Sequence, residues 1–370
     1  MSNVTFANIT FRDYQVEAVQ QIAEKFNSEH AARVLLKMPT GTGKTPVIAA
    51  TIVNQAVHNA LLKGKTRDVL RVVFKTHLER LCKQAERLFV LDSRVQILKS
   101  QADFGYTMPS VFTTVQVVFQ LLSEKLDPTL DIDLVVHDEA HHEACNTHQE
   151  FLEVAGKFPF LGATATPDRA DSLLIKFDHF VEPITRKQAV VTGYVCETDV
   201  RTIVCGDKNK VPMFKEVFTK HHTEMGQTIV FCRTIKECIE VGKHIANTGY
   251  NVFVATSTTT PDELSQALDD LENGVYQFVV NAKRLGEGVD VKGITDICIV
   301  KSLGSYTDLN QYIGRAARPD NPKCQVWEMV NPLSGNNLDC TVVVGKPKSH
   351  IVIYKNGADL VELNFSEKNV

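Results

Sequence analysis

The sequence lacks the features that mark secreted, membrane-spanning or cysteine-ligated metal proteins. Its nine cysteines are scattered and none forms a Cys-x-x-Cys pair. Cys232 and Cys298 lie within apolar runs, where small buried side chains are expected. No apolar run approaches the ~18 residues of a membrane span, and the N-terminus lacks a basic segment followed by an apolar one. We therefore expect a soluble, cytoplasmic protein of a reducing compartment.

The chain also lacks a strong excess of charge of either sign. It has 40 Lys and Arg against 44 Asp and Glu, a net charge of −4 at pH 7. This balance excludes a generally basic surface, so any contact with nucleic acid would use a local cleft. A length of 370 residues with 44% hydrophobic and 23% charged residues is ordinary for a globular protein and sufficient for two domains.

The most informative stretch is 38–45, Met-Pro-Thr-Gly-Thr-Gly-Lys-Thr. It follows a short apolar run at 34–36 and precedes a helical pattern over 46–62. Strand, glycine loop and helix in this order predict a phosphate-binding loop. Met38 stands where the strict pattern has glycine, so the loop is a variant of that pattern.

Each residue of this loop has a physical role in binding a nucleotide. Gly41 and Gly43 allow the tight turn around Thr42 that presents backbone N–H groups to phosphate oxygens. The helix N-terminus adds partial positive charge. Lys44 is expected to reach the β- and γ-phosphates, and the Thr45 hydroxyl to ligate Mg²⁺.

A short polar segment precedes the loop by about thirty residues. Residues 11–15, Phe-Arg-Asp-Tyr-Gln, lead into an amphipathic helical pattern over 16–26. Taken alone, Gln15 is an ordinary surface glutamine. Placed before a phosphate loop, its amide could read the donor and acceptor edge of adenine.

Apolar strand patterns alternate with amphipathic helix patterns along the whole chain. This alternation predicts an α/β fold with two mainly parallel sheets, helices on both faces, and ligands at the carboxyl ends of the strands. The expected strands are 34–36, 69–74, 95–99, 111–118, 134–136, 160–161, 228–232, 252–255, 278–281 and 297–300. The expected helices include 78–89, 235–247 and 261–272.

Two adjacent carboxylates follow the strand at 134–136. With a phosphate loop upstream, Asp138 can hold Mg²⁺, and Glu139 can orient and deprotonate an attacking water. A zinc site is the alternative for the residues just beyond, although their spacing does not fit a zinc pattern. The residues of that alternative are His141, His142, Cys145 and His148.

Three further stretches carry polar groups that a core does not need. In 162–167, Gly-Ala-Thr-Ala-Thr-Pro, the hydroxyls of Thr164 and Thr166 can bond the carboxylates and transmit the nucleotide state. The second stretch is 285–290, Leu-Gly-Glu-Gly-Val-Asp. In the third, Arg315 and Arg318 lie one helical turn apart and suit a phosphate clamp, although a solvated basic face is the simpler reading.

Composition indicates where the domains divide. Glycine, proline and mixed charges at 185–213 suggest a first domain over 1–186 and a second over 187–339. Residues 340–370 are expected to form a small β-meander with strands at 341–344, 351–354 and 360–365. The meander would extend the second sheet, and contact with nucleic acid through Lys346 and Lys348 is the alternative.

Together, these motifs resemble the superfamily 2 helicases of the DEAH type, closest to the branch of phage UvsW, XPB-like proteins and type I restriction motors. The resemblance covers about residues 11 to 320. It implies two tandem RecA-like domains with ATP and Mg²⁺ between them and nucleic acid across both. The motifs occur in the family's order: Arg12/Gln15, 39–45, 113–116, 138–141, 162–167, 286–290 and 311–318.

The resemblance also assigns roles by position. Arg12 and Gln15 resemble the adenine-reading motif, Gly288 and Asp290 the motif near the ribose. Gln311, Arg315 and Arg318 resemble the motif whose arginines contact the γ-phosphate. His141 joins Thr164 and Thr166 among the coupling residues. The expected nucleic-acid contacts are Lys75, Thr76, His77, Thr113, Thr114, Gln116, Arg233, Thr234 and Asn281.

The chain departs from the family in two places. Thr76-His77 replaces an apolar-His-Arg signature, and Glu263-Leu264 stands where relatives have Glu-Arg, which removes one basic contact. No long damage-recognition or nuclease region is present, so we expect a monomeric bare motor, of viral or mobile-element origin. The expected activity is ATP-dependent translocation on or unwinding of DNA. An RNA helicase and a nucleotide-gated subunit of a larger complex remain the alternatives.

Overall fold

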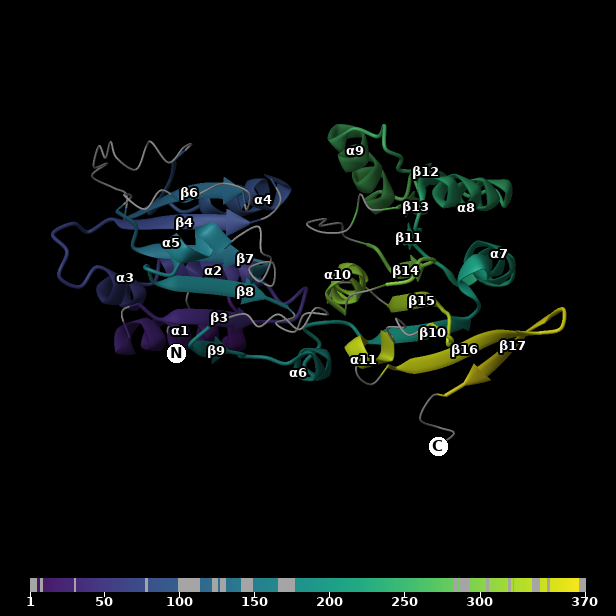
Figure 1. The fold of residues 1–370 in the computed structure, drawn as a ribbon, viewed down its shortest axis with the longest axis horizontal. Helices are drawn as coiled ribbons and strands as arrows, with labels where there is room; N and C mark the ends of the chain where they lie inside the picture. The colour runs from purple at the N-terminus through teal and green to yellow at the C-terminus, as the bar shows by residue number, and fades with distance from the viewer. Residues whose placement is uncertain are drawn as a thin grey trace. The chain divides into compact units, whose positions relative to one another are not determined.

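The chain folds into two compact units, Met1–Thr185 and Arg186–Val370 (Figure 1). Within the described residues, no helix has both the length and the apolar character needed to cross a bilayer. The computed structural model describes residues 5–6, 9–29, 31–76, 79–98, 114–121, 126, 131–140, 149–165, 177–282, 285, 293–303, 306–318, 321, 323–334, 340–344 and 347–365.

The first unit is built on a seven-stranded sheet in the order β5-β6-β4-β7-β8-β3-β9. Every pair of neighbouring strands in it is parallel, which confirms the predicted architecture. A two-stranded antiparallel ribbon, β1 and β2, precedes it. The strands are β1 (Thr5–Phe6), β2 (Ile9–Thr10), β3 (Arg33–Lys37), β4 (Leu70–Thr76), β5 (Val95–Leu98), β6 (Val115–Leu121), β7 (Leu134–Asp138), β8 (Phe160–Thr164) and β9 (His179–Val181).

Helices cover both faces of this sheet (Figure 1). On one face, rings of β4, β6 and α4 pack edge-on, with Phe74 and Phe89 centroids 5.7 Å apart. On the other face, Val73, Val135 and Phe160 pack with Phe151 of α5. Because successive strand residues point to opposite faces, strands buried on both sides are apolar throughout. The helices are α1 (Asp13–Ser28), α2 (Lys44–Ile52), α3 (Gln55–Leu61), α4 (Glu79–Phe89) and α5 (Gln149–Ala155).

The helix expected over 46–62 is two helices, so that prediction was wrong in its continuity. The break follows Val53, and Asn54 begins a new helix there. The Asn54 side-chain oxygen accepts hydrogen bonds from the amides of Ala56 and Val57 at 2.9 and 3.3 Å. A side chain that satisfies the first amides of a helix competes with continuation of the preceding one.

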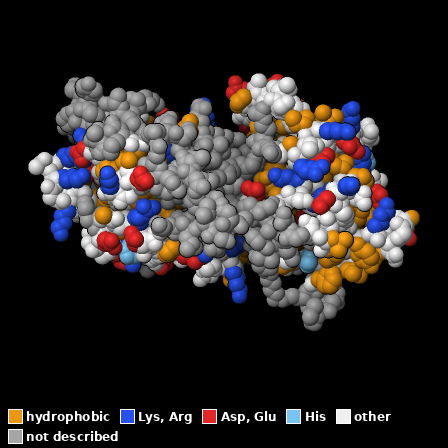
Figure 2. Space-filling view, viewed as in Figure 1, with side chains coloured by type: hydrophobic (Ala, Val, Ile, Leu, Met, Phe, Trp, Pro, Cys, Tyr) orange, Lys and Arg blue, Asp and Glu red, His pale blue; other side chains and the backbone are white. Residues whose placement is uncertain are grey.

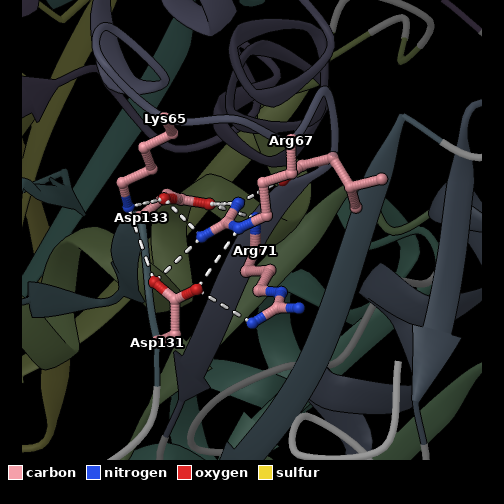
Figure 3. A network of polar contacts seen from close by, with 6 residues as sticks. Lys65, Arg67, Arg71, Asp131 and Asp133 are labelled. Atoms are coloured by element: carbon pink, nitrogen blue, oxygen red, sulfur yellow. Dashed lines mark hydrogen bonds and ion pairs between the residues drawn. The ribbon is translucent and has the colours of Figure 1, made fainter. Parts of the chain in front are cut away.

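An ionic cluster ties the loop before β4 to the loop before β7 (Figure 3). Asp133, whose side chain is 0% exposed, accepts bonds from Lys65, from the Arg67 guanidinium at 2.6 Å and from the Arg71 amide at 2.7 Å. Asp131, 57% exposed, pairs with Arg67 and Arg71 at 3.0 Å each. Burial acts to raise the pKa of Asp131, but the bonds from Arg67 and the surrounding cations hold that pKa below its usual range.

Replacing Asp133 with Ala is expected to lower the free energy of unfolding by about 1.5–3 kcal/mol, because it removes a fully buried carboxylate that accepts from the partly exposed Lys65 and Arg67 side chains and from the Arg71 amide. The matched Asp131→Ala variant should cost under about 1 kcal/mol, since solvent already screens that carboxylate. Urea unfolding of both variants at pH 7 measures the difference. Equal losses for the two variants would contradict the assignment of Asp133 as the centre of the cluster.

The second unit contains an eight-stranded sheet in the order β12-β13-β11-β14-β15-β10-β16-β17. All neighbouring pairs are parallel except β16 and β17, which are antiparallel. Its core gathers around Phe214, Phe218 and Trp327. The strands are β10 (Thr198–Val204), β11 (Thr228–Phe231), β12 (Val252–Val254), β13 (Phe278–Asn281), β14 (Asp296–Ile299), β15 (Cys324–Val330), β16 (Ser349–Asn356) and β17 (Asp359–Asn364).

In Figure 1 this sheet is seen nearly edge-on, with α7 and α8 on one side and α10 and α11 on the other. Capping boxes begin two helices where the sequence predicts them, Thr234 with Glu237 and Thr260 with Glu263. The helices are α6 (Arg186–Val191), α7 (Lys210–His221), α8 (Ile235–Asn247), α9 (Pro261–Glu272), α10 (Tyr306–Ala316) and α11 (Cys340–Val344).

The end of the chain is a helix and a hairpin. Strands β16 and β17 confirm two of the three expected strands, but 341–344 is part of α11, so the third was predicted wrongly. Strand β10 is paired on both sides, with β15 and with β16, so a strand at 341–344 could not pair with it. Cys340 and Val344, four residues apart, are both buried, which is the period of a helix.

Candidate functional site

The glycine loop connects β3 to α2 at the carboxyl edge of the first sheet. Gly41 and Gly43 have φ of 84° and 85°, a left-handed region that side chains rarely adopt. Thr42 lies between them, and its hydroxyl donates to the carbonyl of Pro39 at 2.6 Å. Gly43 is the N-cap of α2, and Lys44 and Thr45 are its first residues. The loop therefore places the unpaired amides of a helix N-terminus beside a lysine and a hydroxyl.

Met38 marks where this loop departs from the strict glycine pattern. Its side chain is 0% exposed, and its amide donates to the carbonyl of Thr164 at 3.1 Å. A large apolar side chain fits here because this position faces the core.

The two carboxylates follow at the end of β7. Asp138 is buried, and the amide of Glu139 donates to its Oδ1 at 3.0 Å. Burial, and then the charge of Glu139, raise the pKa of Asp138 to about 7, while the Lys44 charge and a hydrogen bond with Thr45 act in the opposite direction. These interactions bring together four of the residues predicted from sequence.

Glu139 has an unusual backbone. Its φ of 58° is the one positive value at a non-glycine position within the described residues. Such a conformation costs roughly 1–3 kcal/mol. It turns the chain sharply at the strand end, so that two successive carboxylates stand at one edge.

The donor set fits Mg²⁺ with a nucleotide triphosphate. Carboxylate and hydroxyl oxygens are the ligands that Mg²⁺ prefers, and Thr45 and Asp138 supply both kinds. A buried carboxyl whose pKa is raised by a neighbouring carboxylate is the group that a divalent cation would hold ionised. The glycine loop offers amides to phosphate, and a Cβ at Gly43 would meet Gln15 Nε2 at 2.5 Å. The cradle therefore depends on glycine at that position.

Gln15 bonds to this loop. Its Nε2 donates to the carbonyl of Thr42 at 2.9 Å, and its Oε1 accepts from the amide of Arg12 at 2.9 Å. Both ends of the amide thus have partners within the chain, and adenine reading by Gln15 and Arg12 stays a prediction. The neighbouring Tyr14 hydroxyl donates to the same Thr42 carbonyl at 2.9 Å. The motifs gave Tyr14 no role, because its partner lies 28 residues away.

Thr164 is the last residue of β8. This strand lies between β3, which leads into the glycine loop, and β7, which ends at Asp138. β8 pairs with β3, where Lys37 is opposite Thr164, and with β7, where Asp138 is opposite Ala163. Its side chain is 0% exposed. Thr166, His141 and the histidines and cysteine of the zinc alternative lie outside the described residues. Within the part of the chain that is described, no group of three or more His, Cys, Asp or Glu side chains is placed to hold a metal ion.

In the second unit, α10 carries Gln311 and Arg315 of the predicted arginine motif and ends at Ala316, so Arg318 follows the helix and the prediction that the two arginines lie one helical turn apart was wrong. Tyr312 of this helix stacks on Phe231 of β11, with ring centroids 3.9 Å apart. Gln311 and Arg315 are 8% and 5% exposed. Arg318 is half-buried, and its Nε donates to the carbonyl of Arg315 at 3.2 Å. Gly288 and Asp290 lie outside the described residues.

A hollow of about 370 Å³ lies at the carboxyl ends of β11, β12 and β13. Arg233 and Thr234 line it from one side, Thr256 and Ser257 from another. The Arg233 side chain is 71% exposed and pairs with Glu237 at 3.2 Å. Thr234 caps α8 by accepting from the Glu237 amide. On the face drawn in Figure 2, described Lys and Arg side chains are interspersed with Asp and Glu.

Several expected nucleic-acid contacts lie inside the units. The Lys75 side chain is 0% exposed, with its ammonium 4.0 Å from the centroid of the Phe151 ring. Thr76 is also buried. Asn281 is 0% exposed and donates to the carbonyl of Val230 at 3.2 Å. Because these side chains are buried, they do not fit a direct contact with a ligand. They lie at the carboxyl ends of β4 and β13, inside their units.

Thr114 and Gln116 lie at the opposite edge of the first sheet from the glycine loop. β6 begins at Val115, so both residues are at its amino end. The Thr114 hydroxyl donates to the carbonyl of Arg94 at 3.3 Å, and Gln116 is 2% exposed. The sequence interpretation expected nucleic-acid contacts at these positions, and this location does not fit them. His77 and Thr113 lie outside the described residues.

Comparison with known proteins matches each unit to a domain family. Residues 8–169 match the family described as type III restriction enzyme, res subunit, and residues 209–320 match the helicase conserved C-terminal domain. The chain is 25% identical over 376 residues to the "Putative ATP-dependent helicase IRC3" of Saccharomyces cerevisiae, covering 90% of this chain and 53% of that protein.

Two further similarities concern restriction enzymes. The chain is 23% identical to the type I restriction enzyme EcoAI endonuclease subunit of Escherichia coli, over 85% of this chain and 45% of that one. The solved structure of the ATP-dependent type ISP restriction-modification enzyme LlaBIII bound to DNA shares the fold, with a TM-score of 0.70 and 16% identity, over 95% of this chain and 32% of that one. The chain thus spans about half the length of these curated relatives.

Proposed function

Because the chain belongs to the superfamily 2 helicases and carries both helicase domains, we propose that it hydrolyses ATP with Mg²⁺ to move along or unwind DNA. One observation carries this proposal. The left-handed glycine loop, Lys44, Thr45, the buried Asp138 and the half-buried Glu139 meet at one edge of a parallel sheet. The two units would be the ATP-binding domain, 1–186, and its partner, 187–339, with 340–370 as an extension of the second.

The residues of the first unit would divide the work of hydrolysis. Loop amides and Lys44 bind and neutralise phosphate oxygens. Thr45 and Asp138 hold Mg²⁺, which supplies charge neutralisation at the phosphates when it is bound. Glu139 orients the attacking water and accepts its proton at a carboxylate oxygen. Thr164, with Thr166 and His141, would sense the state of the site from the neighbouring strand.

The second unit would supply further positive charge at the γ-phosphate. Arg315 and Arg318 suit the γ-phosphate because the planar guanidinium pairs with two oxygens at once. Gln311 lies on α10 with Arg315, and Arg318 follows the end of that helix. A site completed only when both units meet the nucleotide would couple hydrolysis to their relative motion, with Gly288 and Asp290 near the ribose.

DNA is the proposed track, in remodelling of duplex or branched DNA during replication, recombination or repair. The support is similarity to proteins named as restriction enzymes, one of them described as bound to DNA. Contact would be to phosphates at the carboxyl edge of the second unit, where Arg233 is exposed and Thr234 opens α8. Phosphate contacts predict little sequence preference and strong salt dependence.

ATP turnover measured with single-stranded DNA, duplex DNA, forked DNA and RNA tests the proposal. DNA should raise turnover, and Lys44→Ala should abolish it. The matched control is Lys37→Ala, a lysine of β3 that pairs with Glu182 at the protein surface. Stimulation by RNA alone would make the chain an RNA helicase. Turnover that no nucleic acid changes would favour a nucleotide-gated subunit of a larger complex.

Arg233→Ala is expected to raise the DNA concentration for half-maximal stimulation about 5- to 10-fold at low salt. It should also reduce, by about one, the slope of the logarithm of DNA affinity against the logarithm of salt concentration. The variant removes the exposed guanidinium group of a residue that lines the hollow. Lys243→Ala, an exposed lysine further along α8, should keep the wild-type value. Equal effects of the two variants would show that only overall charge matters.

A further inference from the structure

Tyr14 belongs to the first turn of α1, and the helicase motifs leave it without a role. It is buried, and its hydroxyl donates to the carbonyl of Thr42 at 2.9 Å. Gln15 donates to the same oxygen at 2.9 Å. Two donors from consecutive residues of a helix therefore converge on one carbonyl of the glycine loop.

The direction of the Tyr14 hydrogen bond is fixed by a third residue. The Arg12 guanidinium donates to the Tyr14 oxygen at 3.2 Å. Arginine can only donate, so the tyrosine oxygen accepts there, and its own proton is left to point at Thr42. The Thr42 carbonyl, with two lone pairs, accepts from both side chains at once.

This arrangement sets the direction of the next amide. A trans peptide is planar, with its C=O and N–H on opposite sides. Holding the Thr42 carbonyl toward α1 makes the N–H of Gly43 point away from α1. Gly43 has a φ of 85°, and a Cβ there would meet Gln15 Nε2 at 2.5 Å. A flipped peptide would instead present a carbonyl dipole where the loop needs a donor for phosphate.

We propose that Tyr14 is a positioning residue for the triphosphate. Together with Gln15 it holds the Thr42–Gly43 peptide in the orientation in which the Gly43 N–H binds a phosphate oxygen. This inference rests on the proposed function, because it needs a phosphate ligand in the loop. It assigns the effect of Tyr14 to the phosphates and none to the base.

Binding of three probes to the full chain, measured by calorimetry, tests the inference. Tyr14→Phe should weaken MgATP and Mg²⁺-tripolyphosphate equally, by about tenfold, as expected for loss of one hydrogen bond. Adenosine binding should not change. Unchanged tripolyphosphate affinity in the variant would overturn the inference. Failure of the wild type to bind either phosphate probe would instead overturn the proposed function, and the inference with it.

A matched control separates positioning from stability. Tyr250→Phe also removes a hydroxyl, one that bonds His222 Nδ1 at 2.9 Å in the second unit. It should keep wild-type affinity for tripolyphosphate even if its melting temperature falls as much as that of Tyr14→Phe. Weakened binding in both variants would mean that general loss of stability explains the effect.

A double variant tests the shared carbonyl directly. In Tyr14→Phe or Gln15→Met alone, one donor still holds Thr42. With both replaced, the peptide can rotate, so the loss in tripolyphosphate affinity should exceed the product of the two single losses. Effects that simply multiply would show that the two side chains act independently, against the proposed mechanism.

Discussion

An Asp138→Asn variant is expected to melt at a higher temperature than the wild type at pH 8 without nucleotide, and to hydrolyse ATP about 10²–10³-fold more slowly. The loss of rate would follow from removing a carboxylate ligand for Mg²⁺, and the gain in stability follows from the pKa of Asp138. Burial and the charge of Glu139 raise the pKa of Asp138 to about 7 from its usual 3.8. At pH 8 the wild type therefore keeps a buried carboxylate ionised beside another, and the neutral amide avoids that cost.

The pH dependence of stability provides the measurement. A carboxyl whose pKa is raised by folding favours the folded state while it is protonated. This contribution is complete below about pH 4 and is lost as pH rises through about 7. Melting temperatures at pH 5 and pH 8 should therefore differ less in Asp138→Asn than in the wild type. A variant that melts lower than the wild type at pH 8 would contradict this account.

Asp131→Asn is the matched control, because the same substitution should have the opposite sign there. The pKa of Asp131 is held below its usual range by Arg67 and its neighbours, despite burial that acts to raise it. Its carboxylate therefore stabilises the fold at pH 8, weakly because it is 57% exposed. Excess MgADP should raise the melting temperature of this control and of the wild type, but much less that of Asp138→Asn.

Local patterns predicted the parts of the structure that depend on neighbours in sequence. Helices α8 and α9 begin and end at the expected residues, because capping boxes of four residues define their starts. The glycine loop was predictable for the same reason. Left-handed backbone at Gly41 and Gly43 requires glycine at those positions, and an apolar run on each side identifies the strand and the helix.

Features that depend on distant residues were not predictable. The run at 341–344 reads as a strand, but it is part of α11, in which Cys340 and Val344 are both buried at helical spacing. Strand β10 was missed because it mixes Arg201 with apolar residues. That arginine is satisfied by Glu224 at 2.6 Å and by the Trp327 ring, partners that lie far along the chain.

The predicted site residues divide in the same way, into those that local sequence places and those whose surroundings depend on distant residues. That Lys44, Thr45, Asp138 and Glu139 lie together was predictable, because each lies at the end of a strand or the start of a helix at one sheet edge. Burial of Lys75 under the Phe151 ring could not be seen, since the two residues lie 76 positions apart in the numbering. The convergence of Tyr14 on Thr42 also became visible only in the fold.

The last prediction concerns the arginine motif at the end of α10. Arg318→Ala is expected to lower the rate of ATP hydrolysis by about 10³–10⁵-fold, the range found for arginines that stabilise a transferring phosphoryl group. Nucleotide affinity should change little, because in the proposed mechanism the loop and Lys44 would bind most of the phosphate charge in the ground state. Arg318 is chosen over Arg315 because it is half-buried, whereas Arg315 is 5% exposed and its loss would also weaken the fold.

Single-turnover hydrolysis and equilibrium binding of MgATP separate the two effects. Arg318→Lys keeps the charge but loses the planar fork, so it should recover only a small part of the rate. Arg201→Ala is the control: it removes an arginine that pairs with Glu224 and packs on Trp327, and should cost stability without changing the rate constant. A normal hydrolysis rate in Arg318→Ala would remove the second unit from the chemistry, and with it the reason to regard this chain as a motor driven by the meeting of two domains.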